Sequence, residues 1–368
     1  MPRRPAQVIL CGPFPEGGAI GGYARCNSLI AGSFLDEEFG IAKLALTVPG
    51  NGGPARRMAE DMKRVVTVLL REKAPILHLT AQYTTGTPRE YAIFKLAKAH
   101  KRKFLLDIRA GWFFDWFYDP KAPVRRWMLT EMIRGADAIT VEGRRYMPWL
   151  KENFNRDAVY FPNFVTERDG QLVPPAALCQ PEPGQPVELV YAGRLAEQKG
   201  IEEALDACAI LLQRGVAVRM NLAGNGDRSF TEPLQRQIER LPPGTVVQHG
   251  TLSHSGVLEL FSRSHMLVFP TRWVGEGHAN VVNEAMQAGL PLVTTRQGFL
   301  GDVVTPECGV VLDSVSPQTV ADGVAALVAD WPRLQAAGKA ARERVYSQFS
   351  DRVALAGLGA VYRALLAT

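Results

Sequence analysis

The regular alternation of short apolar runs with amphipathic stretches constrains the fold more than any other feature of this chain. Between the apolar runs lie segments such as 56–72 and 89–100, whose apolar residues recur at helical spacing. Strands that are apolar throughout and alternate with helices predict parallel sheets covered on both faces. The expected strands are 7–11, 41–46, 76–80, 104–108, 138–141 and 159–161, then 187–192, 217–223, 246–249, 266–269, 292–295 and 310–312.

A proline-rich stretch divides the two series of strands. Residues 166–186 contain five prolines, which is typical of a linker. A chain of 368 residues also favours two domains over one core. We therefore predict two doubly wound α/β domains, 1–165 and 187–350. Ligands of such sheets bind at the carboxyl ends of the strands, so a cleft forms the site if the two edges face each other.

The composition indicates the cellular compartment of the protein and the classes of partner that it could bind. No apolar run approaches the roughly 20 residues of a membrane-spanning helix, and the N-terminus lacks the apolar core of a signal peptide. The five cysteines are scattered, which favours a reducing, cytoplasmic compartment. Residues 1–165 carry 25 basic and 16 acidic residues (+9), whereas the remainder carries 17 and 21 (−4). The first half therefore either faces an anionic partner, such as a lipid surface or nucleic acid, or has an unevenly charged solvated surface.

Glycine-rich turns follow several of the expected strands. The segment GPFPEGGAIGGY, 12–23, follows the first strand and includes Gly21 and Gly22, but it lacks the dinucleotide-binding spacing. It is either a flexible turn or a place where the backbone approaches a ligand. In the second half, AGRLAEQKG brings Arg194 and Lys199 to the start of a helix, where a phosphate would meet two cations and the positive helix end. The turn AGNG, with Gly224, ends the next strand.

Two carboxylates stand close together in the stretch WVGEGHANVVNEAMQAGLPLV, 273–293. Glu276 lies in a glycine-rich loop, and Glu284 lies on the helix that we expect to begin near Asn280. The amides of Asn280, Val281 and Val282 are expected to point from the helix start toward an anion. Taken alone, each glutamate and each cation has the alternative interpretation of a solvated surface charge.

Together these motifs carry a resemblance. The set GRL…KG, G-N-G and E-G-x-x-N-V-V-x-E-A-M-x-x-G-L-P resembles family 4 of the retaining glycosyltransferases, which have the GT-B fold. The E-x7-E pair of that family falls on Glu276 and Glu284, and the likeness covers nearly all of 187–350. The N-terminal half is similar to that family only in its alternation of strands and helices and in its glycine-rich first loop. The resemblance implies an acceptor-binding first domain, a donor-binding second domain, and a C-terminal helix, 351–368, that packs on the first domain.

The resemblance also implies roles for the motif residues. Glu284 accepts hydrogen bonds from the ribose of a nucleotide, and Glu276 accepts them from the donor sugar, with Arg194 and Lys199 facing the leaving diphosphate. The backbone at Gly224, Gly277, Asn280, Val281 and Val282 lies against the donor, and His278 contributes to sugar selectivity. The expected donor is a UDP- or GDP-sugar, and the acceptor is a saccharide or a lipid-linked saccharide used in cell-surface polysaccharide or glycolipid synthesis.

The mechanism that follows uses no metal and no other cofactor. The sequence contains no D-x-D motif, which metal-dependent transferases use, so the two cations and the helix start would stabilise the leaving group. Retention is carried over from the family, through front-face attack without a protein nucleophile. The two glutamates are not a glycosidase acid–base pair.

Two features of the first half have open interpretations. Arg109 follows the expected strand 104–108, and His78 belongs to the preceding strand, 76–80. Both are candidates for the acceptor side of the cleft, and His78 is alternatively a buried structural histidine. The segment from Trp112 to Arg126 has six aromatic residues in its first seven positions, followed by basic residues. It suits an anionic membrane interface, which would make the protein peripheral on the inner face of the cell membrane, an acceptor groove, or the core.

Other classes of function remain as alternatives. A sugar-nucleotide epimerase shares the two-domain form but needs acid–base residues in the cleft. A non-catalytic nucleotide-sugar sensor would keep Glu284 without needing Arg194 and Lys199. A nucleic-acid binder could use the basic half, but the sequence contains no recognition motif for nucleic acid.

Overall fold

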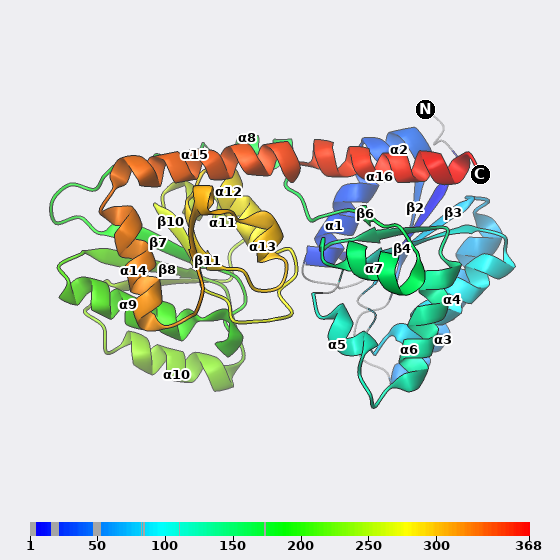
Figure 1. The fold of residues 1–368 in the computed structure, drawn as a ribbon, viewed down its shortest axis with the longest axis horizontal. Helices are drawn as coiled ribbons and strands as arrows, with labels where there is room; N and C mark the ends of the chain where they lie inside the picture. Colours follow the sequence, from blue (N-terminus) through cyan, green and yellow to red (C-terminus); the bar gives the residue numbers. More distant parts are fainter. Residues whose placement is uncertain are drawn as a thin grey trace. The chain divides into compact units, whose positions relative to one another are not determined.

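The computed structural model describes residues 5–15, 22–46, 53–81, 83, 85–109, 111–172 and 174–368. The chain divides into two compact units, each of which is described by itself. Unit 1 comprises Met1–Asn163 with Val353–Thr368, and unit 2 comprises Phe164–Arg352. Figure 1 shows a sheet with surrounding helices in each unit.

Unit 1 contains a six-stranded sheet with the order β2-β1-β3-β4-β5-β6. Every neighbouring pair is parallel, and its central strands are almost entirely buried, as expected for a sheet with helices on both faces. The strands are β1 (Val8–Gly12), β2 (Ile41–Ala45), β3 (Ile76–Ala81), β4 (Lys103–Ile108), β5 (Ala138–Val141) and β6 (Val159–Tyr160). The helices are α1 (Gly22–Ala31), α2 (Phe34–Phe39), α3 (Pro54–Arg71), α4 (Thr87–Ala99), α5 (Phe113–Phe117), α6 (Pro123–Gly135) and α7 (Tyr146–Phe154).

The C-terminal helix α16 (Asp351–Leu366) completes unit 1. Its Tyr362 ring meets Phe39 of α2 edge-on at 5.4 Å, and Arg363 pairs with Glu38 of α2 at 2.8 Å. Figure 1 shows α16 in red beside α2. The Tyr362 hydroxyl also lies 2.7 Å from Nδ1 of His78 on β3, so α16 is tied to the sheet as well as to α2.

Unit 2 contains a second parallel sheet with the order β12-β11-β10-β7-β8-β9. The strands are β7 (Val187–Ala192), β8 (Val218–Ala223), β9 (Val246–Gly250), β10 (Met266–Phe269), β11 (Leu292–Thr295) and β12 (Gly309–Leu312). The helices are α8 (Glu167–Leu172), α9 (Ile201–Gln213), α10 (Arg228–Ile238), α11 (His254–Ser262), α12 (Asn280–Gln287), α13 (Leu300–Val303), α14 (Pro317–Val328) and α15 (Trp331–Gln348). Short 3-10 turns, η2 (Glu197–Lys199) and η3 (Pro306–Cys308), precede α9 and β12.

The sequence prediction of a doubly wound α/β fold with two parallel sheets is confirmed. All twelve expected strands are present, and their bounds differ from those expected by at most one residue at either end. The proline-rich stretch 166–186 lies inside unit 2: it begins with α8, and the carbonyl of Leu178 accepts a hydrogen bond from Trp331 Nε1 at 2.8 Å. Among the described residues, the structure has no helix whose length and apolarity would let it span a membrane.

Candidate donor site at the switch point of unit 2

The order of the strands reverses in the middle of the unit 2 sheet, between β7 and β10. The chain runs from β7 outward to β8 and β9, and then returns to the other side of β7 as β10. The carboxyl ends of β7 and β10 therefore form the topological switch point, where ligands of doubly wound sheets bind. The segments that follow these strands are 193–199 and 270–279.

Glycines allow the loops at this edge to touch through their backbones. Gly224, after β8, has a φ of +142°, and a Cβ there would lie 1.8 Å from the carbonyl oxygen of Gly193, after β7. Gly200 has a φ of +70°, and a Cβ would lie 2.1 Å from the carbonyl oxygen of Pro270. Any side chain would separate these loops. Gly224 therefore holds two loops of the site together.

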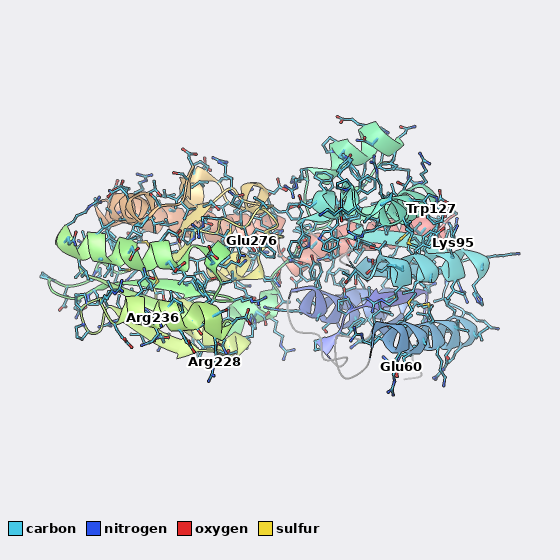
Figure 2. All side chains as sticks on the ribbon, turned by 90° about the horizontal axis from the view of Figure 1, so that it is seen from below. Glu60, Lys95, Trp127, Arg228, Arg236 and Glu276 are labelled. Carbon is cyan, nitrogen blue, oxygen red and sulfur yellow. The ribbon has the colours of Figure 1, made fainter. Side chains whose placement is uncertain are left out.

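Lys199 and Glu276 meet at the switch point. The Lys199 Nζ lies 2.7 Å from Oε2 of Glu276, and the Thr271 hydroxyl donates to the same oxygen at 2.8 Å. The Lys199 and Glu276 side chains are only 13% and 6% exposed. Figure 2 labels Glu276 within unit 2. These residues are far apart in the sequence, and the meeting of η2 with the loop after β10 brings them together.

Aromatic rings surround the lysine. Its Nζ lies 4.6 Å from the ring centre of Trp273 and 5.5 Å from that of Phe269. An ammonium over aromatic faces gains electrostatic attraction, which grows as water is excluded. Removing either Lys199 or Glu276 would leave the charge of the other buried without its partner. Lys199 is therefore fixed in position by a carboxylate on one side and rings on the other.

Arg194 occupies a more exposed place at the same edge. Its guanidinium pairs with Asp227 at 2.8 Å, and the two side chains are 69% and 75% exposed. An exposed pair of this kind contributes little to stability, so the guanidinium can exchange Asp227 for another anion at small cost.

In the loop before α12, the side chain of His278 is buried inside unit 2. Gly277 separates Glu276 from His278, whose Nε2 lies 2.9 Å from Oδ1 of Asn283. The His278 ring is 1% exposed and meets Phe349 edge-on at 4.9 Å. The structure therefore gives this side chain a packing role inside unit 2, whereas the sequence prediction placed it beside a donor sugar.

Helix α12 begins at the expected residue. Asn280 and Val281 form its first positions, and Glu284 lies on it with a side chain that is 10% exposed. The amide of Val282 donates to the carbonyl of Ala279 at 3.0 Å. It is therefore engaged in the first turn, and the expectation that all three amides of this turn face an anion is wrong for Val282.

A histidine that sequence analysis missed lies beside Glu284. His254 Nδ1 is 3.7 Å from Oε1 of Glu284, and its Nε2 is 3.3 Å from Oδ2 of Asp169 on α8. Thr271, Trp273 and Asp169 were also missed. Thr271 directly follows β10, so the rule that ligands bind beyond the strand ends could have identified it.

The acceptor-side candidates of unit 1 lie in its interior. Arg109 and His78 are both fully buried. Arg109 Nε donates to Asp107 at 2.6 Å and its Nη1 donates to Asn163 at 2.7 Å, while His78 Nε2 lies 3.5 Å from Asp107. Gly22 begins α1, and Gly21 lies outside the described residues. His78 thus has the surroundings of a buried structural histidine, which was its alternative interpretation.

The charges in this cluster stabilise one another. Burial alone would raise the pKa of Asp107, but the Arg109 guanidinium and the neighbouring His78 ring lower that pKa below its usual value. Burial opposes the charge on Arg109 as well, yet the Asp107 carboxylate raises the pKa of the guanidinium above its ordinary value. Both groups are therefore ionised and paired.

The aromatic segment 112–126 packs largely against its own unit. Phe113 and Phe117 are buried, and Phe114 lies edge-on to Tyr146 at 4.7 Å and to Trp149 at 5.0 Å. The exposed apolar side chains lie farther along: Tyr118 is 45% exposed, Val124 is 62% exposed and Trp127 is 52% exposed. The idea of a fully exposed aromatic segment is therefore wrong for the two buried phenylalanines.

Comparison with known proteins locates a family match in unit 2. Residues 180–344 match the family Glycosyl transferases group 1. A glycogen synthase of Mycobacterium tuberculosis is 34% identical over 194 residues, which are 52% of this chain and 45% of that protein. The capsular polysaccharide biosynthesis glycosyltransferase CapM of Staphylococcus aureus is 26% identical over 179 residues, or 48% and 46%. The chain thus matches less than half the length of either relative.

Solved structures resemble the fold of the whole chain. A sucrose-phosphate synthase from Thermosynechococcus elongatus gives a TM-score of 0.78 at 18% identity, covering 98% of this chain and 99% of that one. The Anabaena protein HepE, solved with UDP and glucose, gives 0.71 at 16% identity, covering 99% and 100%. The chain therefore has the two-domain GT-B fold, and the donor-site candidates of unit 2 fall within the segment that matches the group 1 glycosyl transferases.

Proposed function

We propose that this chain is a retaining, metal-independent glycosyltransferase of family 4, which moves a sugar from a UDP- or GDP-sugar to a saccharide or lipid-linked acceptor. One observation carries the proposal: Lys199 pairs with Glu276 at the carboxyl edge of the unit 2 sheet, within the matched segment, and Glu284 lies on α12, the next helix along the chain. Relatives named for glycogen, capsule and colanic acid synthesis support an assignment to polysaccharide or glycolipid synthesis.

The hydrogen bonds at the switch point suit a division of roles between the two glutamates. Lys199 and Thr271 both contact Oε2 of Glu276, so we assign Oε1 to a hydroxyl of the donor sugar. Glu284, on α12, accepts from the ribose hydroxyls. Lys199 has three N–H donors, so it can hold Glu276 and still donate to a phosphate oxygen.

The proposed transfer needs charge stabilisation more than a protein nucleophile. The bond between the anomeric carbon and the diphosphate breaks, and the acceptor hydroxyl attacks the same face while its proton passes to the departing phosphate oxygen. Lys199, and Arg194 once released from Asp227, stabilise the negative charge that grows on the leaving group. With those cations and no D-x-D motif, we propose that the reaction uses no metal ion and no cofactor.

The proposed acceptor and location rest on the charge and the exposed aromatic residues of unit 1. The +9 charge of residues 1–165 and the exposed Tyr118 and Trp127 suit a lipid-linked acceptor and peripheral attachment to the inner face of the cell membrane. Trp127 and Lys95, both labelled in Figure 2, each contact Tyr91, which gives this surface an aromatic and basic character. We therefore propose a cytoplasmic protein that acts at that surface.

Incubation with radiolabelled UDP-, GDP- and ADP-sugars tests the proposal. We expect slow hydrolysis of one donor, unchanged by EDTA, with retention at the released sugar. Interconversion of the sugar without its release would favour the epimerase alternative. Binding of a nucleotide sugar without turnover would favour a non-catalytic sensor, and no interaction with any donor would overturn the proposal.

A further inference from the structure

A basic hollow lies at the edge of the unit 1 sheet, lined by residues of the edge strand β2 and of α3. Its volume is about 520 Å³, which is within the roughly 300–1,000 Å³ of small-molecule sites. The lining includes Lys43, Leu44 and Ala45 of β2 and Glu60, Lys63 and Arg64 of α3. Three of the lining residues are cations and one is a carboxylate, so the hollow carries a net positive charge.

The spacing of residues along α3 explains the helix side of the hollow. The lining positions 60, 63, 64, 67 and 68 are separated by three or four residues and therefore share one face of the helix. The neighbouring row, Asp61, Val65 and Leu69, is buried. Lys63 and Arg64 lie beside that buried row and stay exposed. Figure 2 labels Glu60, the first lining residue of this helix.

The strand side places the hollow near the carboxyl edge of the sheet. Residues 43–45 are the last three of β2, and they pair in parallel register with 10–12, the last three of β1. The Lys43 Nζ lies 5.8 Å from the ring centre of Phe14, in the segment that follows β1. Ligands of parallel α/β sheets bind at this edge. Lys43 therefore lies where a ligand of unit 1 is expected.

The charges of the hollow suit an anion with several oxygens. Glu60 pairs with Arg56 at 2.9 Å, so a cation outside the lining balances its charge. Lys43 comes from the strand, whereas Lys63 and Arg64 come from the helix. Two ammonium groups and a guanidinium on two sides of one hollow can hold separate oxygens of a phosphate. Their placement around a single hollow suits one such group better than the long backbone of a nucleic acid.

We propose that this hollow binds a phosphate or diphosphate group, held by Lys43, Lys63 and Arg64, and that the group belongs to the acceptor of the proposed transfer. The site then selects an acceptor that carries phosphate, either on a lipid-linked saccharide or on a soluble sugar phosphate. Naming the ligand as the acceptor rests on the proposed function. The binding of the anion does not, because every lining residue belongs to unit 1.

Hydrogen exchange with and without inorganic pyrophosphate tests the site. In the wild type, pyrophosphate should protect peptides covering 41–46 and 56–70. Lys63→Gln with Arg64→Gln should raise the concentration needed for half-maximal protection by roughly tenfold or more. Arg71→Gln with Lys73→Gln removes two exposed cations at the far end of the same helix and is the matched control, which should behave as the wild type. Protection confined to unit 2, or equal losses in the two double variants, would overturn the inference.

Two further probes distinguish the sources of the phosphate. Protection of the same peptides by glucose 1-phosphate would assign a soluble acceptor. Protection by phosphatidylcholine vesicles that contain polyprenyl phosphate, but not by phosphatidylcholine alone, would assign a lipid-linked one. Protection by neither probe would overturn the assignment to the acceptor.

The outcomes also separate this inference from the proposed function. Donor hydrolysis by a wild type that pyrophosphate does not protect at 41–46 and 56–70 would overturn the inference and leave the proposed function standing. Protection of these peptides in a protein that hydrolyses no donor would support the phosphate site and overturn the proposed function.

Discussion

Each unit buries a cation–carboxylate pair near the carboxyl end of its strands, but the two pairs have different surroundings. In unit 1, Arg109 and Asp107 are fully buried, and Arg109 also binds Asn163 and stacks over Phe161 at 4.5 Å. In unit 2, Lys199 ends the 3-10 turn η2 and Glu276 lies in the loop after β10, and their side chains are 13% and 6% exposed. The first pair is enclosed within a core network, whereas the second lies at the edge of the sheet and keeps part of its surface exposed.

The difference suits a structural role for the pair of unit 1 and the proposed catalytic role for the pair of unit 2. Every part of the Arg109 guanidinium has a protein partner, so a ligand there would have to replace hydrogen bonds that hold the strands. Lys199 is held by one carboxylate and by ring faces, which leaves N–H donors for a phosphate. We therefore expect changes to the unit 1 pair to alter stability, and changes to the unit 2 pair to alter turnover.

Asp107→Asn should have the largest effect. It leaves Arg109 buried without its carboxylate, which should destabilise unit 1 by about 3–5 kcal/mol. Urea unfolding followed by circular dichroism measures this. Asp227→Asn, which removes the exposed partner of Arg194, is the control and should change stability by less than about 1 kcal/mol. Equal losses of stability in the two variants would contradict the expected difference between the buried pair and the exposed pair.

Lys199→Met should instead lower turnover. It removes the cation proposed to face the leaving group, so donor hydrolysis should fall about 10²–10³-fold. The KM for the donor should change much less, because the leaving-group charge is greatest in the transition state. Lys339→Met, an exposed lysine of α15, should retain activity. Loss of wild-type activity in EDTA that magnesium restores would contradict the metal-free scheme.

Unit 1 should also have its own pH dependence. Burial raises the pKa of Glu90 to about 7, although Arg89 opposes the shift. The unfolded chain releases this proton near pH 4.5 and the folded chain only near pH 7. The contribution of Glu90 to the free energy of unfolding should therefore decrease between these values by about 3 kcal/mol. Glu90→Gln should remove this decrease, and identical pH profiles for both proteins would contradict the assignment.

The two glutamates of unit 2 should differ in nucleotide binding. Glu284→Gln removes the charged acceptor that we propose for the ribose and should weaken nucleoside diphosphate binding by ~1.5–3 kcal/mol. Glu276→Gln should barely change that affinity and should instead impair use of the intact sugar donor. Calorimetry with the free nucleotide and kinetics with the donor measure the two effects. Equal losses of nucleotide affinity would contradict the division of roles.

The smallest effect concerns the membrane. Sedimentation with anionic vesicles at low salt should show reversible association that weakens as salt is added. Tyr118→Ser with Trp127→Ser should reduce it, whereas Leu172→Ser, which removes a similarly exposed side chain from unit 2, should not. The absence of any association in the wild type would exclude this role for unit 1.

The positions of the strands could be predicted from the sequence, because apolar runs and turn residues are features of neighbouring residues. The sequence also singled out Lys199 and Glu276, which meet at the switch point of unit 2, since glycine-rich turns mark the strand ends. It did not predict that Lys199 bonds to Glu276, because that contact depends on how two distant loops meet. It placed Arg109 at an acceptor surface because the sequence does not reveal that Asp107 and Asn163 enclose its guanidinium.

The sequence also did not predict which way individual side chains point. The position of His278 in the loop was predictable, but its inward orientation depends on Phe349, which comes from a distant part of the chain. Likewise, spacing alone identified an aromatic segment at 112–118 without revealing that Phe113 and Phe117 turn toward the core. Which face of a short irregular segment is buried depends on neighbours that arrive from elsewhere in the fold.

Hydrogen exchange with and without a nucleoside diphosphate tests the central claim most directly. We predict that UDP, GDP or ADP, whichever binds, protects peptides covering 193–200 and 271–288 in unit 2, because we propose the switch point as the donor site. Peptides covering 104–109 in unit 1 should exchange at the same rate in both states. Binding that protects the unit 1 peptides and leaves those of unit 2 unchanged would contradict the account.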